Sequence, residues 1–156
     1  MHRLILLRHA ETEQHSAGGD FDRALTPRGQ EDAALAGQTL ASRGFVPDLA
    51  LVSTARRAVQ TWEALRTAFP DARAELEPEL YNASAEALFA AARAADASTV
   101  VVVAHNPGLQ ILALDLVVRA GAGREAGLGP HHFPPGAAAI FRFEGGAPVF
   151  EAMIAP

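Results

Sequence analysis

Thr99-Val-Val-Val-Val-Ala104 is the strongest strand signal in this sequence of 156 residues. Its apolar residues follow one another without alternation, which is typical of a strand buried on both faces. Leu4-Ile-Leu-Leu7 and the segment from Leu49 to Val52 have the same character. Strands of this kind belong to parallel sheets that are covered by helices on both sides. The sequence therefore predicts an α/β fold.

Helical patterns separate these strands. Four helices are indicated by apolar spacing and by start and stop residues, within Thr26 to Gly44, Ala58 to Pro70, Ser84 to Ala92 and Asn106 to Leu116. A weaker strand at 74–76 and two closing strands at 137–143 and 149–154 complete the sheet, and Gly145-Gly146 joins the last two. Residues 11–23 and 121–136 are expected to be loops. The prediction is one domain, 1–156: a three-layer α/β sandwich with a mostly parallel central sheet, helices on both faces and a C-terminal hairpin at or near its edge.

The composition favours a cytoplasmic protein with a sizeable core. Hydrophobic residues make up 49% of the chain and charged residues 20%. Lys and Arg total 13 against 18 Asp and Glu, a net charge of −5, which argues against binding to nucleic acid or to an anionic membrane. The chain has no cysteine, so thiolate catalysis and disulfides are excluded. The N-terminal apolar run is too short for a signal peptide, and no stretch is long enough to cross a bilayer.

Basic side chains and histidines follow three of the predicted strands. The first strand ends in Arg8-His9, the second continues into Ser53-Thr-Ala-Arg-Arg57, and the valine strand ends in His105-Asn106. The carboxyl ends of parallel strands form one edge of the sheet, where ligands bind in folds of this type. Guanidinium groups hold phosphate through paired hydrogen bonds, and a neutral imidazole can attack phosphorus. A second imidazole, if protonated, would add positive charge. These residue types predict a phosphate site.

Four segments resemble the motifs of the histidine phosphatase superfamily, the phosphoglycerate-mutase-like enzymes. They are Leu6-Leu-Arg-His-Ala-Glu-Thr12, Leu25-Thr-Pro-Arg-Gly29, Ser53-Thr-Ala-Arg-Arg-Ala-Val-Gln-Thr61 and Val101-Val-Val-Ala-His-Asn106. The third is similar to the family's Ser-x-x-x-Arg-Ala-x-Gln-Thr segment. The short chain resembles the SixA-like phosphohistidine phosphatases, which are compact members of the family.

The resemblance implies roles for particular residues. His9 would be the nucleophile that becomes phosphorylated, and Arg8, Arg56 and His105 would form the phosphate pocket. We place Arg56 at the motif's arginine, in register with Ala58 to Thr61, and expect Arg57 to be a solvated helix residue. The implied reaction needs no cofactor and no metal ion. Adjacent His131 and His132 are expected to lie in an exposed loop rather than to bind a metal.

Two positions depart from the family pattern. Ala10 stands where glycine is common, and Asn82 stands where many members have a glutamate that acts as the general acid. Glu79 is a possible substitute acid. An alkoxide leaving group needs a proton donor far more than an imidazole, whose conjugate acid has a pKa of about 6.5. We therefore expect a phosphohistidine substrate.

Two types of partner follow from these considerations. The first is a phosphorylated protein that carries phosphohistidine, such as a phosphotransfer domain. The second is a small phosphorylated metabolite. A phosphomutase and a non-catalytic phosphate-binding module are the remaining alternatives.

Overall fold

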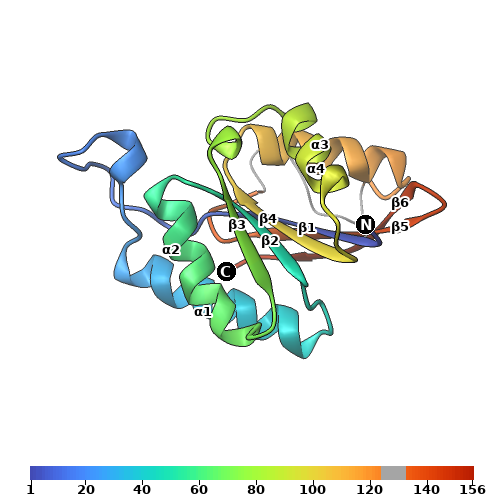
Figure 1. Ribbon diagram of the computed structural model, residues 1–156, viewed down its shortest axis with the longest axis horizontal. Coiled ribbons are helices and arrows are strands. Elements are labelled where there is room, and N and C mark those ends of the chain that lie inside the picture. Colours follow the sequence, from blue (N-terminus) through green and yellow to red (C-terminus); the bar gives the residue numbers. More distant parts are fainter. Residues whose placement is uncertain (124–132) are drawn as a thin grey trace.

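A computed structural model of the chain describes residues 1–123 and 133–156 (Figure 1). Its strands are β1 (Arg3–Arg8), β2 (Leu49–Ser53), β3 (Arg73–Glu77), β4 (Thr99–Ala104), β5 (Ala138–Glu144) and β6 (Ala147–Ile154). Its helices are α1 (Pro27–Ser42), α2 (Arg56–Leu65), α3 (Ala85–Ala94) and α4 (Gly108–Arg119), with short 3-10 helices η1 (Asp20–Asp22), η2 (Arg66–Ala68) and η3 (Pro78–Leu80).

The strands form one mixed sheet in the order β3-β2-β4-β1-β5-β6. Strands β3, β2, β4 and β1 run parallel, whereas β5 pairs antiparallel with β1 and β6 antiparallel with β5. The chain leaves β1 for β2 and later returns to insert β4 between them. The ends of β1, β4 and β2 are therefore neighbours, which is the condition for a shared site at this edge.

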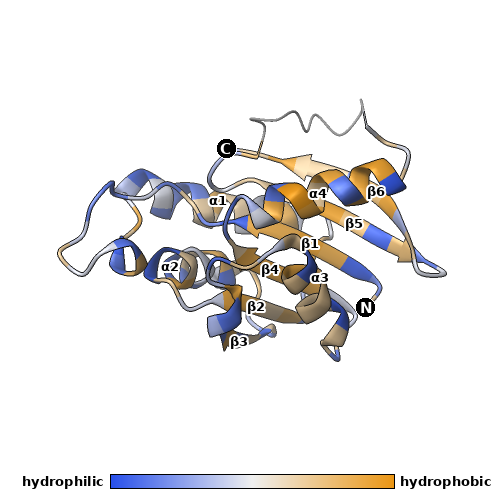
Figure 2. Cartoon of the chain, turned by 90° about the horizontal axis from the view of Figure 1, so that it is seen from above, coloured by the Kyte–Doolittle hydropathy of each residue, from blue (hydrophilic) through white to orange (hydrophobic). Residues whose placement is uncertain are grey.

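Helices cover both faces of the sheet, α1 and α2 on one side and α3 and α4 on the other (Figure 1). Successive residues of β1 point into different layers: Leu4 and Leu6 pack in the core with α3 and α4, and Ile5 and Leu7 pack in the core with α1 and α2. All four are fully buried. Figure 2 shows apolar strands at the centre of the molecule, and the hydrophilic residues of the helices are most abundant on α1 and α2. The predicted three-layer α/β architecture is confirmed.

Local signals set the element ends. Thr26 and Ser84 cap α1 and α3, because each side-chain oxygen accepts a backbone N–H of the first turn. Gly145 and Gly146 both have positive φ and form the turn of the predicted β5–β6 hairpin at the sheet edge. In the part of the chain that the structure describes, we find no helix with the length and apolar character needed to span a bilayer.

Candidate active site

Two buried histidines meet at the carboxyl ends of β1 and β4. The two strands pair in register with Arg8 opposite Ala104, and the N–H of His9 donates to the carbonyl of Ala104 at 3.1 Å. The sheet therefore places His9 and His105 side by side, with ring centroids 5.3 Å apart. Each residue is only 6% exposed. The predicted juxtaposition of these two histidines is present in the structure.

His9 carries its ring proton on Nδ1 and is neutral at pH 7. Its Nδ1 lies 2.8 Å from the carbonyl oxygen of Ala10, and a carbonyl can only accept, so Nδ1 carries the proton. The lone pair is then on Nε2. Burial, together with the positive charges of Arg57 and Arg8, lowers the pKa of His9 to about 3. The ring is therefore neutral at pH 7 and able to attack an electrophile through Nε2.

His105 is held by a residue from the end of β2. Its Nε2 lies 2.7 Å from Oγ of Ser53, which also accepts the backbone N–H of Ala55 at 3.3 Å. This arrangement favours donation from the serine hydroxyl to Nε2, which leaves the ring proton on Nδ1. Burial and the charge of Arg57 lower the pKa of His105 to about 4, so the free ring is neutral at pH 7. It can offer one N–H donor.

Two arginines bring positive charge to the histidines. Arg8 donates from Nη1 to the carbonyl of Phe133 at 3.1 Å, and the pKa of Arg8 is lowered by burial and by the charge of Arg57. Within the described residues, Nε of Arg8, Nε of Arg57 and Nδ1 of His105 are buried without a hydrogen-bond partner. Buried donors without partners are costly, and the oxygens of a tetrahedral anion would satisfy them.

The arginine at this site is Arg57 rather than Arg56. Arg57 is 4% exposed, so the prediction of a solvated residue is wrong. Its charge acts on His9, His105 and Arg8. The side chain of Arg56 is 49% exposed and lies 3.8 Å from the carboxylate of Asp22. The predicted position of Arg56 in the pocket is corrected accordingly.

Two sequence signals identify Arg57 in retrospect. In the family segment the arginine directly precedes the alanine, which is Ala58 here, and that position is 57. Arg57 also shares a helix face with Thr61 and Leu65, both fully buried. Neighbouring residues of a helix point about 100° apart, so Arg56 faces outward when Arg57 faces the core.

The loop 11–23 supplies residues that the sequence did not identify. It contains η1, and Asp20 of η1 accepts hydrogen bonds from Arg57 at 3.2 Å and from Arg23 at 3.1 Å. The charge of Arg23 contributes to the lowered pKa of His105. The hydroxyl of Tyr81 donates to Asp20 at 2.6 Å and lowers the pKa of that carboxyl group to about 2. Asp20 thus links three side chains around the histidines.

The segment after β3 presents a tyrosine to the site. Tyr81 lies edge-on to His105, with ring centroids 5.7 Å apart. Glu79 is exposed, and its carboxyl group lies beside that of Glu77. Asn82 is exposed and has a φ of 58°. The contacts that the structure records between this segment and the histidines come from Tyr81.

The substitution of glycine by Ala10 is accommodated. Ala10 is fully buried with Leu25 and Ala33, and its φ is not positive, so the backbone does not require glycine. Its N–H donates to Oγ1 of Thr61 at 3.0 Å, which ties the residue after His9 to α2. Gly29, by contrast, is required by space, because a Cβ atom there would collide with the carbonyl oxygen of Glu11.

The lowered histidine pKa values predict a pH-dependent stability. Between pH 6.5 and about 4 the unfolded chain binds protons that folded His9 and His105 do not, so the free energy of unfolding should fall as the pH decreases. Each histidine contributes up to about 1.4 kcal/mol per pH unit. Urea unfolding of the wild type and of His105→Asn at pH 7, 6 and 5 measures this, with exposed His2→Gln as control. If the free energy of unfolding changed with pH in the same way for the wild type and His105→Asn, the lowered pKa of His105 would be contradicted.

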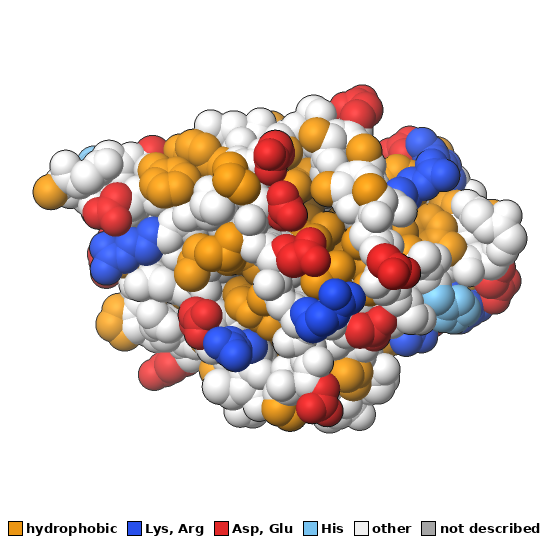
Figure 3. Space-filling model, viewed as in Figure 1, with side chains coloured by type: hydrophobic (Ala, Val, Ile, Leu, Met, Phe, Trp, Pro, Cys, Tyr) orange, Lys and Arg blue, Asp and Glu red, His pale blue; other side chains and the backbone are white. Residues whose placement is uncertain are grey.

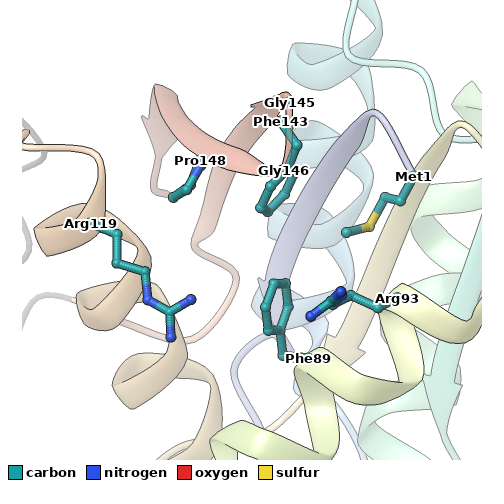
Figure 4. Close-up of a pocket in the computed structure, with 8 residues that line it drawn as sticks. All are labelled: Met1, Phe89, Arg93, Arg119, Phe143, Gly145, Gly146 and Pro148. Atoms are coloured by element: carbon teal, nitrogen blue, oxygen red, sulfur yellow. The ribbon is translucent and has the colours of Figure 1, made fainter.

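A separate hollow of about 500 Å³ lies at the opposite end of β1 (Figure 4). Figure 4 shows Arg93 and Arg119 on two different helices, with Phe89 and Phe143 between them. Both arginines lie in the last turn of their helices, where the helix dipole stabilises a positive charge. Because the hollow lies beside Met1 and the histidines follow the other end of β1, the two sites are separate.

Other features of the described chain bear on the sequence predictions. Acidic and basic side chains are interspersed over the face shown in Figure 3. In residues 1–123 and 133–156 no group of three or more His, Asp or Glu side chains is arranged to hold a metal ion. His131 and His132, for which an exposed loop was predicted, lie outside the described residues.

Comparisons with known proteins show the family and the fold. The sequence model of the histidine phosphatase superfamily (branch 1) matches residues 4–86, more than half of the chain. The structure of the candidate phosphohistidine phosphatase SixA from Agrobacterium tumefaciens superposes with a TM-score of 0.87 and 29% identity, covering 99% of this chain and 98% of that one. The structure of its counterpart from Nakamurella multipartita superposes with a TM-score of 0.81 and 31% identity, covering 99% of this chain and 96% of that one.

A curated relative is longer than this chain. An uncharacterised chloroplastic protein of Arabidopsis thaliana is 32% identical over 119 residues, which are 68% of this chain and 55% of that protein. The chain thus spans about half the length of this relative.

Proposed function

The chain belongs to the histidine phosphatase superfamily, and from this we propose that it hydrolyses a phosphorylated substrate through a covalent phosphohistidine on His9. The observation that carries the proposal is the state of His9. Its Nδ1–H donates to the carbonyl of Ala10, and its Nε2 holds a lone pair. The charges of Arg8 and Arg57 act on the ring, and His105 lies beside it. Each of these three neighbours has a buried donor atom without a partner among the described residues. A nucleophile among donors that suit a tetrahedral anion is the arrangement that phosphoryl transfer requires.

The reaction proceeds in two steps. Nε2 of His9 forms a bond to phosphorus while the bond from phosphorus to the leaving atom breaks, and the leaving atom takes the electron pair and a proton. Water then bonds to phosphorus, the bond to Nε2 breaks, its electron pair returns to the ring, and the water releases a proton. The positive charges of Arg8 and Arg57 balance the charge that develops on the phosphoryl oxygens in both steps, and neutral His105 donates a hydrogen bond to these oxygens from Nδ1.

The favoured substrate is phosphohistidine on a protein. Glu79 is exposed and lies beside Glu77, and within residues 1–123 and 133–156 no Asp or Glu is buried, so the described residues offer no buried carboxylic acid to protonate an alkoxide. An imidazole leaves more readily, because its conjugate acid has a pKa near 6.5. The similarity of the chain to two candidate phosphohistidine phosphatases supports the same substrate class.

The test is a panel of phosphoryl donors. The protein is incubated with a phosphohistidine-bearing protein, acetyl phosphate or a sugar phosphate, and the acid-labile phosphoryl group on the enzyme is trapped by rapid quenching. We expect a phosphoenzyme from the first two donors and a much lower kcat/KM for the sugar phosphate. Equal kcat/KM for phosphohistidine and sugar phosphates would remove the basis for the substrate proposal, and absence of any phosphoenzyme would remove the mechanism.

Glu79→Gln is expected to leave phosphohistidine hydrolysis within about twofold of the wild type. The exposed carboxyl group has no recorded contact with the described site residues, and general acid catalysis contributes roughly 10²–10⁴-fold where it operates. The measurement is kcat/KM for phosphohistidine and acetyl phosphate at pH 7. A loss of a hundredfold or more would identify Glu79 as the general acid after all.

A further inference from the structure

Aromatic rings form a continuous row from the buried nucleophile to the solvent. The rings of His9 and His105 are 5.3 Å apart, those of His105 and Tyr81 are 5.7 Å apart, and those of Tyr81 and Phe21 are 5.1 Å apart. The two pairs that involve Tyr81 are edge-to-face, an arrangement that favours aromatic contact. The row begins at residues that are 6% exposed and ends at Phe21, which is 45% exposed.

The outer two rings are fixed relative to the phosphate-binding arginine. The hydroxyl of Tyr81 donates to the carboxylate of Asp20, and Nη2 of Arg57 lies 3.2 Å from the same carboxylate. Nη1 of Arg57 donates to the carbonyl of Asp20 at 2.8 Å, and the guanidinium lies 5.8 Å from the centre of the Tyr81 ring. Phe21 follows Asp20 directly in η1. The positions of the Phe21 and Tyr81 rings therefore depend on Asp20, which also holds Arg57.

The outer rings have no part in the two-step reaction described above. Their side chains offer no nucleophile, and the Tyr81 hydroxyl already donates to Asp20. An exposed phenylalanine beside a polar site does, however, provide an apolar surface for a flat group. The leaving group is the part of a substrate that must extend from the buried phosphoryl site toward solvent, and the row of rings likewise leads from buried His9 to exposed Phe21.

We propose that Phe21 and Tyr81 form a leaving-group subsite that favours substrates whose leaving group is a flat ring, such as the imidazole of phosphohistidine. This inference rests on the proposed function and adds to it a physical basis for substrate choice. Stacking or edge contact with an aromatic ring contributes a selectivity of roughly three- to tenfold per ring. A ring-free donor with the same phosphoryl group gains nothing from the subsite.

The subsite acts in the first step only. When Nε2 of His9 takes the phosphoryl group, the phosphorus–nitrogen bond of the substrate breaks and the released imidazole keeps the electron pair and gains a proton. Hydrolysis of phosphorylated His9 by water follows after that ring has left, so this step is the same for every donor. Changes to Phe21 should therefore alter the rate of phosphoenzyme formation and leave the rate of its breakdown unchanged.

The experiment compares three donors: N-phosphohistidine, the phosphoramidate ion and acetyl phosphate. Phosphoramidate has the phosphorus–nitrogen bond without a ring, so it separates ring recognition from bond type. Rapid quenching gives the rate of phosphoenzyme formation for the wild type and for Phe21→Ala. We expect Phe21→Ala to lower kcat/KM for N-phosphohistidine by roughly three- to tenfold and to leave the other two donors within twofold.

Matched variants separate the ring from bulk and from structure. Phe21→Tyr should restore the rate with N-phosphohistidine, whereas Phe21→Leu, which is apolar but has no ring, should not. Val118→Ala, at another exposed apolar position that is 73% exposed on α4, should change none of the three rates. Tyr81→Leu should show the same donor selectivity as Phe21→Ala, together with a general loss because the hydrogen bond to Asp20 is removed.

Two results would overturn the inference while the proposed function stands. The first is that Phe21→Ala changes kcat/KM for all three donors by the same factor, or for none of them. The other is full restoration by Phe21→Leu. Absence of phosphoenzyme from every donor in the wild type would instead be a failure of the proposed function itself.

Discussion

His9→Ala is expected to lower phosphatase turnover by at least about 10⁴-fold and to abolish the acid-labile phosphoenzyme. Nε2 of this residue is the atom that forms the bond to phosphorus, and no cysteine is present to take its place. Arg8, Arg57 and His105 would remain, so the variant should still bind a phosphate analogue such as vanadate or tungstate. The measurements are kcat with acetyl phosphate, quench trapping of the phosphoryl group, and calorimetric titration with the oxyanion.

His9→Gln is the companion variant, since glutamine keeps polar bulk in a position that is 6% exposed. Its thermal unfolding should remain cooperative, which separates loss of chemistry from loss of fold. Substantial turnover or a trapped phosphoryl group in a folded His9 variant would mean that another residue is the nucleophile.

Arg57→Ala is expected to reduce kcat/KM by roughly 10²–10³-fold, with the effect divided between oxyanion affinity and kcat. The buried guanidinium of Arg57 is within electrostatic reach of both histidines, and its Nε has no partner among the described residues. Arg56→Ala is the matched neighbour, and we expect it to stay within about twofold of the wild type. Its side chain is half exposed and lies near Asp22. Steady-state kinetics and oxyanion titration of both variants measure the difference.

Arg57→Lys tests whether the guanidinium itself is needed. Lysine keeps the charge but cannot form the paired hydrogen bonds of arginine with Asp20 and with a phosphoryl group, so partial recovery of activity is expected. If Arg56→Ala caused the larger loss and Arg57→Ala the smaller one, the sequence-based position of Arg56 would be right and the structural position of Arg57 would not describe the active protein.

The order of elements and their layers followed from the sequence. Continuous apolar runs such as Leu4 to Leu7 predict strands buried on both faces, because a strand that exposed one face would alternate with polar residues. Thr26 and Ser84 mark helix starts, and Gly145-Gly146 marks a turn, through interactions within a few residues of each position. Such local interactions are visible in a sequence. So is the position of His9 and His105 directly after two predicted strands, whereas the adjacency of these two strands in the sheet is seen only in the structure.

Only the tertiary structure decided which side chains surround these histidines. Asp20 and Tyr81 are 61 residues apart, and nothing in either segment indicates the hydrogen bond between them. Ser53 reaches His105 because β2 and β4 are adjacent. The low pKa values of both histidines depend on burial and on charges from distant segments. Sequence patterns determine short-range geometry and layer order, whereas loop contacts and electrostatics depend on distances that exist only after the chain has folded.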